Sequence, residues 1–136
     1  MILEEDSLLN FRYNTVTQIL SVNWPDLTNT PLPEIENSLQ KLARNIKNFD
    51  IRKVLADHRH GFTSLEGEAY KKVVEDYHRC LAETHLEKIA RIIPENPAWE
   101  YFIIQLSQEL KEKLNLPFEV RIFTKKAEAM EWLLEP

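Results

Sequence analysis

Glycine and cysteine are both scarce in this sequence of 136 residues, and the scarcity excludes several kinds of site. The two glycines, Gly61 and Gly67, fall far below the usual share of about 7%. They cannot form the glycine-rich loops that bind dinucleotides or cradle phosphates. The single cysteine, Cys80, excludes an internal disulfide and a zinc cage built from cysteines. We expect Cys80 to be a small apolar filler, because nothing near it indicates an activated thiolate.

Long apolar runs and concentrated basic runs are also missing. No run approaches the roughly 20 residues that span a bilayer, and the first residues do not resemble a signal peptide. The net charge is −5, and the longest basic runs are the doublets at 71–72 and 125–126. Binding to phosphates or to an anionic membrane needs a denser basic surface. We therefore expect a cytoplasmic protein that binds neither nucleic acid nor membranes.

The chain's hydrophobic periodicity predicts a single α/β domain over residues 1–136. Alternating apolar residues predict strands at 9–13, 16–24, 51–56, 89–93 and 118–123. The first two strands are expected to form an antiparallel hairpin with its turn at Asn14. Residues spaced at three and four predict four helices, each with a buried stripe. The order is β-β-α-β-α-β-α-β-α, which predicts one five-stranded mixed sheet covered by helices.

Further expectations concern the helices. Residues Thr63 to Glu66 match the capping-box pattern at the start of the second helix. The buried stripe of this helix is expected to contain Leu65, Ala69, Val73, Tyr77 and Leu81. Thr124 is expected to cap the last helix, with Ala127, Met130, Trp132 and Leu133 available to pack. His78 and His85 are expected at the surface or core edge, without a role.

The third helix looks apolar on more than one side. The residues that produce this pattern are Trp99, Phe102, Ile103, Ile104 and Leu106. A helix with one face exposed to solvent is expected to carry polar residues along that face. We expect its extra apolar side to face a second subunit or another helix, such as the last one.

The most chemically suggestive run is Asp57-His58-Arg59-His60, at the carboxyl end of the third strand, where ligands often bind in open α/β sheets. Two imidazoles beside a carboxylate could bind a metal or act as acid and base. No second cluster completes a metal shell by its spacing, so we expect neither a metal nor catalysis. The alternative is a structural or partner-facing turn, in which Asp57 accepts backbone N–H groups and Arg59 pairs with a carboxylate.

Three motifs now resemble those of a family, the STAS or SpoIIAA-like domain, and in particular its small stand-alone bacterial members. A tryptophan closes the second strand in Val22-Asn23-Trp24. The third strand ends in Leu55-Ala56-Asp57-His58-Arg59. The last helix, after Phe123, contains Ala129-Met130-Glu131-Trp132-Leu133. The likeness spans nearly the whole chain. It implies a non-enzymatic, regulatory cytoplasmic module without a cofactor, acting by protein–protein interaction, with a homodimer as one form.

We expect a partner to bind at the tip of the third strand and the start of the second helix. The candidate partner- or ligand-binding residues are Asp57, His58, Arg59, His60, Thr63 and Ser64. Phosphorylated members carry an acceptor serine in an Asp-Ser-Ser-Gly-like turn, but the flanking residues here differ. Ser64 is thus a candidate phospho-acceptor, with a capping hydroxyl as the alternative. A carrier or sensor of a small apolar or anionic ligand, in a fold related to the lipid-binding CRAL-TRIO domains, remains an alternative function. An enzyme using Asp57, His58 or His60 is a third.

Overall fold

A computed structural model describes residues 3, 5–27, 29–60 and 68–136. Within these ranges the chain forms five strands and four helices, in the order expected from the sequence. Their bounds are β1 (Asn10–Asn14), β2 (Ile19–Asn23), α1 (Leu32–Asn48), β3 (Lys53–Asp57), α2 (Glu68–Ala82), β4 (Lys88–Ile92), α3 (Pro97–Lys113), β5 (Glu119–Phe123) and α4 (Lys126–Leu134). The predictions of a mixed α/β fold and a five-stranded mixed sheet are confirmed.

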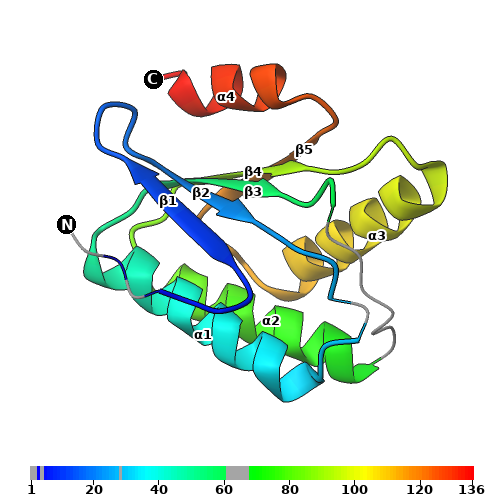
Figure 1. The fold of residues 1–136 in the computed structure, drawn as a ribbon. Helices are drawn as coiled ribbons and strands as arrows, with labels where there is room; N and C mark the ends of the chain where they lie inside the picture. Colours follow the sequence, from blue (N-terminus) through cyan, green and yellow to red (C-terminus); the bar gives the residue numbers. More distant parts are fainter. Residues whose placement is uncertain (1–2, 4, 28, 61–67) are drawn as a thin grey trace.

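The strands lie in the sheet in their sequence order, from β1 to β5. β1 is antiparallel to β2, and the four strands from β2 to β5 are parallel. From β2 to β5, each new parallel strand is added at the same edge of the sheet. Right-handed crossovers that proceed in one direction place their connecting helices on one face of the sheet. Figure 1 shows α1, α2 and α3 on that face and α4 on the other.

Alternation along the strands divides the core between the two faces. The α1–α2 face carries the larger cluster, with Leu20, Val54 and Ile89 from neighbouring strands under the two helices. The α4 face carries a smaller cluster, in which strand residues meet the last helix: Ile19, Leu55, Ala90 and Ile92 with Ala129, Trp132 and Leu133. β4 is therefore buried on both sides.

The hairpin turn differs from the prediction. β2 begins at Ile19, and Val16 is 90% exposed in the turn rather than on the buried strand face. The positive φ angle of 60° falls on Gln18, not on Asn14. Asn14 instead organises the turn through its side chain, because its Oδ1 accepts hydrogen bonds from the backbone N–H groups of Val16 and Thr17.

Several predicted helix details are wrong. The N-cap of α4 is Lys125 and has no side-chain cap, so Thr124 does not cap this helix. Ala69, Cys80 and Ala127 are exposed instead of buried. Val73, Tyr77 and Leu81 do form the buried stripe of α2. The expected capping box at Thr63–Glu66, and Leu65 within it, lie outside the described residues. No helix in the described ranges is long and apolar enough to cross a bilayer.

Candidate functional site

The turn after β3 is organised by one carboxylate. Asp57 Oδ1 accepts the backbone N–H of Arg59 at 3.0 Å, as predicted, and the Arg59 side chain pairs with the same carboxylate, Nη2 to Oδ2 at 2.7 Å. Burial alone would raise the pKa of Asp57, but the hydrogen bonds and charge of Arg59 outweigh it and hold the pKa below its usual value. Arg59 and His60 are exposed, whereas Thr63 and Ser64 lie outside the described residues.

His58 does not share the exposure of its neighbours. Its imidazole stacks on the indole of Trp24, with ring centroids 4.7 Å apart and planes 19° from parallel. Its Nε2 is buried without a hydrogen-bond partner among the described residues. Burial, with a smaller contribution from the positive charge of Arg91, lowers the pKa of His58 to about 3. An imidazole that binds protons this weakly is a poor general base at neutral pH.

His78, expected at the surface or the core edge, is fully buried in α2 and only 1% exposed. Its Nδ1 lies 2.8 Å from the carbonyl oxygen of Val74, and its Nε2 lies 3.2 Å from Nη2 of Arg91. A carbonyl only accepts and a guanidinium only donates, so Nδ1 carries the proton and Nε2 accepts. Burial and then the charge of Arg91 lower the pKa of His78 to about 4, which keeps this ring neutral.

Arg91 sits within the sheet itself. Val22, Ala56, Arg91 and Ile122 are register partners on β2, β3, β4 and β5. Their row lies on the face of the sheet covered by α1, α2 and α3. The residue is only 9% exposed. A cation at such a position has lost most of its contact with water and needs neighbouring groups or a ligand to compensate. The sequence offered one signal for it, an arginine inside the otherwise apolar run Ile89–Ile93.

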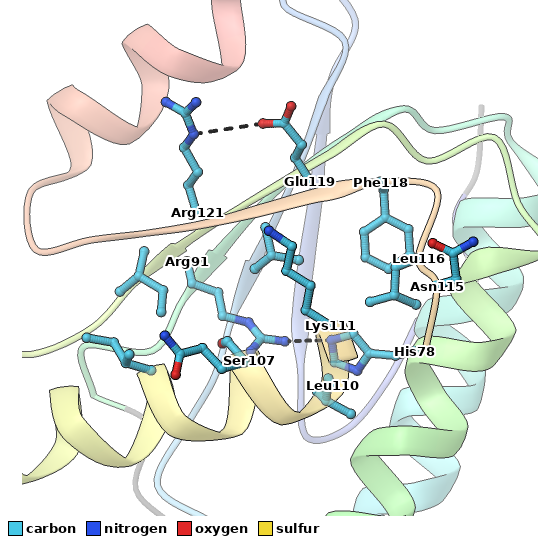
Figure 2. Close-up of a pocket in the computed structure, with 14 residues that line it drawn as sticks. His78, Arg91, Ser107, Leu110, Lys111, Asn115, Leu116, Phe118, Glu119 and Arg121 are labelled. Atoms are coloured by element: carbon cyan, nitrogen blue, oxygen red, sulfur yellow. Dashed lines mark hydrogen bonds and ion pairs between the residues drawn. The ribbon is translucent and has the colours of Figure 1, made fainter. Parts of the chain in front are cut away.

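A pocket of about 640 Å³ opens beside Arg91, between α3 and the β4–β5 edge of the sheet (Figure 2). α3 packs against α2 through a small apolar cluster. Its buried leucines, Leu106, Leu110 and Leu114, contact Val74 of α2. On the opposite face, α4 lies directly on β3, β4 and β5. The volume falls within the range of small-ligand sites.

The inner end of the pocket is the part beside Arg91 and Ser107. Arg91, hydrogen-bonded to His78, reaches it from β4, and Ser107 lines it from α3. The Ser107 hydroxyl is buried without a hydrogen-bond partner among the described residues. Lys111 extends from α3 toward β5 (Figure 2). The rest of the lining is mixed: Gln108 and Asn115 are polar, and the apolar residues are Ile104, Leu110, Leu116, Phe118, Val120 and Ile122.

The other charged pair near the pocket faces elsewhere. Glu119 and Arg121 line the pocket from β5, but Figure 2 shows their side chains on the α4 side of the strand. They form an ion pair at 3.8 Å, and the Arg121 guanidinium lies 5.1 Å from the Trp132 ring centroid. The charged side chains directed at the pocket by the described lining residues are therefore cationic, Arg91 and Lys111.

The sequence predicted that the extra apolar side of α3 would face a second subunit or another helix, such as the last one. α4 lies on the opposite face of the sheet, so the last helix does not cover it. Ile104 lines the pocket and is 38% exposed, while Tyr101 is 68% exposed. The side chains of Trp99 and Ile103 lie outside the description. Some of the surplus apolar surface thus forms a pocket wall.

Among the described residues, no group of three or more histidine, cysteine, aspartate or glutamate side chains could hold a metal ion. The run 57–60 does not form such a group of ligands, because Asp57 pairs with Arg59 and His58 stacks on Trp24.

No family model matches the chain, and the comparisons with curated proteins and with solved structures give no match either. The pocket beneath α3 and the turn after β3 are therefore judged on their own chemistry.

Proposed function

We propose that this chain is a non-enzymatic binding module, related to STAS domains, that holds a small ligand in the pocket beneath α3. The observation that carries the proposal is the pocket's construction. The pocket has a volume of about 640 Å³, within the range of small-ligand sites, and both polar and apolar side chains line it, with the buried guanidinium of Arg91 among them. The element order and the three motifs support the relation to STAS domains, and the single cysteine suits a cytoplasmic location.

The state of the buried imidazoles supports binding rather than catalysis. His58 and His78, with pKa values of about 3 and 4, are neutral at physiological pH and accept protons poorly. His78 is also committed on both ring nitrogens, to Val74 and to Arg91. His78 can therefore position Arg91 and shape the site without taking part in proton transfer.

The binding function is tested by NMR with the full chain and a library of small neutral and charged fragments. We expect fragments that bind to shift the amide signals of pocket residues such as Leu116 and Ile122. Ser107→Phe should abolish these shifts by filling the pocket. Gln105→Phe is the matched control, since Gln105 is exposed on the same helix and does not line the pocket. Fragments that bind Ser107→Phe as well as wild type, or none at the pocket, would refute the proposal.

A protein partner at the turn after β3 is the second candidate function. It is favoured by the rigid presentation of Arg59, whose guanidinium is held by Asp57 while the side chain remains 40% exposed. A fixed, exposed guanidinium is preorganised to meet a carboxylate or phosphate on another protein. Native mass spectrometry of protein purified from its own host separates the two functions, because a small ligand and a second polypeptide add very different masses.

A further inference from the structure

This inference rests on the proposed ligand-binding function and concerns the chemical class of the ligand. The inner end of the pocket joins a buried guanidinium, Arg91, to a hydroxyl without a partner, Ser107. A guanidinium donates in a planar fork that matches a carboxylate or phosphate, and a hydroxyl can donate one further hydrogen bond. Both groups therefore suit an oxyanion.

The electrostatic surroundings favour the same class of ligand. One acceptor for Nη2 of Arg91 is the neutral imidazole of His78, which offers a lone pair and carries no charge of its own. Lys111 adds a second cation, and the acidic side chain of Glu119 points to the other face of the sheet. An anion in this pocket would meet two positive side chains, whereas a cation would be repelled by both.

The apolar walls indicate that the ligand is more than a small inorganic ion. Leu110, Leu116, Phe118, Val120 and Ile122 line the space beyond the polar end. Water against these side chains is displaced favourably by hydrocarbon, at about 25 cal/mol per Å² of apolar surface buried. A bare phosphate would leave this surface wet.

We propose that the pocket binds an amphipathic oxyanion, whose carboxylate or phosphate headgroup is held by Arg91 and Ser107 and whose apolar body lies against the wall formed by β5 and α3. Lys111 attracts the headgroup from the α3 side. His78 is a positioning residue, because it holds the Arg91 guanidinium without having to contact the ligand.

The experiment compares octanoate with octanamide, which has the same tail and a neutral head, by NMR titration of the full chain. Wild type should bind octanoate about tenfold or more tightly than octanamide, since charged hydrogen bonds are the stronger kind. Arg91→Met should remove that preference. Octyl phosphate in place of octanoate shows which headgroup fits better, and inorganic phosphate alone should bind weakly.

Two further variants keep the test valid if Arg91→Met does not fold. Lys111→Met, at an exposed position, should weaken octanoate but not octanamide, and Ser107→Ala should do the same. Lys113→Met is the matched control on α3, since Lys113 pairs with Glu75 at 3.0 Å and does not line the pocket. Its octanoate affinity should stay unchanged.

The outcomes separate the two proposals. If octanamide binds wild type as tightly as octanoate, or if fragments occupy the pocket while octanoate does not, the oxyanion inference is wrong and the binding function stands. If nothing binds the pocket, both are wrong.

Discussion

The two faces of the sheet at the β4–β5 edge are built in opposite ways. On the α4 side, Ala90 and Ile92 pack against Trp132 and Leu133 in a cluster of apolar side chains. On the α3 side, the intervening residue of the same strand is Arg91, and it faces a pocket of about 640 Å³. Adjacent positions in one five-residue strand thus serve a dry core and a polar cavity.

The difference separates what stabilises this domain from what it can bind with. Burying Ile92 and Leu133 contributes about 1.5–3 kcal/mol each to the free energy of folding. Burying Arg91 and an unpartnered Ser107 hydroxyl costs free energy instead. A polar cluster that opposes folding, in a domain otherwise closed by apolar packing, points to a use in the folded protein.

The largest expected effect is a loss of stability in mild acid, caused by His78 beside the pocket and His58 in the turn after β3. The folded protein keeps His58 and His78 neutral down to pKa values of about 3 and 4, while the unfolded chain protonates them near 6.5. Protons therefore favour the unfolded state, and stability present above pH 6.5 is lost as the pH falls toward 4. From pH 7 to pH 5 the free energy of unfolding should fall by about 2 kcal/mol per histidine, or about 4 kcal/mol in total.

Urea unfolding at pH 7 and pH 5 measures this loss. The buried carboxylates do not confuse it, because the lowered pKa values of Asp6 and Asp57 place their protonation below this window. His78→Gln should roughly halve the loss. A wild-type loss below about 1 kcal/mol would show that the two imidazoles are not buried as the structure has them.

The second effect compares the same substitution on the two faces. Ile92→Ala removes a fully buried side chain from the α4 cluster and should lower the free energy of unfolding by about 3 kcal/mol. Ile122→Ala enlarges a space that already exists, so it should cost about 1 kcal/mol. Urea unfolding of both variants measures the difference. Equal losses would mean that the α3 side is packed as tightly as the α4 side.

The sequence predicted the order of the strands and helices and the main buried positions. Period-two alternation and helical stripes gave the element order, and Ile35, Leu39, Leu42 and Ile46 are all buried as their spacing requires. The backbone hydrogen bond to Asp57 was also predicted, as was a carboxylate partner for Arg59, because these groups lie within one short turn. Such features depend on neighbours in the chain, which periodicity and turn chemistry describe directly.

The pocket could not be predicted in the same way. His78, Arg91 and Ser107 come from three different elements, and nothing in their spacing shows that they meet. His78 was read as a surface or core-edge residue because polar side chains on an amphipathic helix usually face water. The cavity itself lies between α3 and the β4–β5 edge, so its presence depends on tertiary packing. The rule that ligands bind at the strand ends also needs a reversal in strand order, which this sheet lacks.

The smallest expected effect contrasts one lysine from each face. On the α4 side, Lys88 Nζ donates to the carbonyl oxygens of Trp132 and Glu135, at 3.1 and 3.3 Å, and lies 5.0 Å from the Trp132 ring centroid. It supplies the positive charge that the last turn of α4 lacks. Lys88→Met should therefore lower the free energy of unfolding by about 1 kcal/mol, measured by urea unfolding.

Lys111→Met is the counterpart on the α3 side, and its free energy of unfolding should stay within about 0.5 kcal/mol of wild type, as for most exposed sites. Its effect should appear only when octanoate is added, since ligand stabilises the folded state in proportion to its affinity. Lys88→Met should show the reverse, reduced stability with unchanged octanoate binding. If Lys111→Met destabilises the free protein as much as Lys88→Met does, Lys111 is a structural cation. The contrast between a face built for stability and a face built for binding would then fail at this residue.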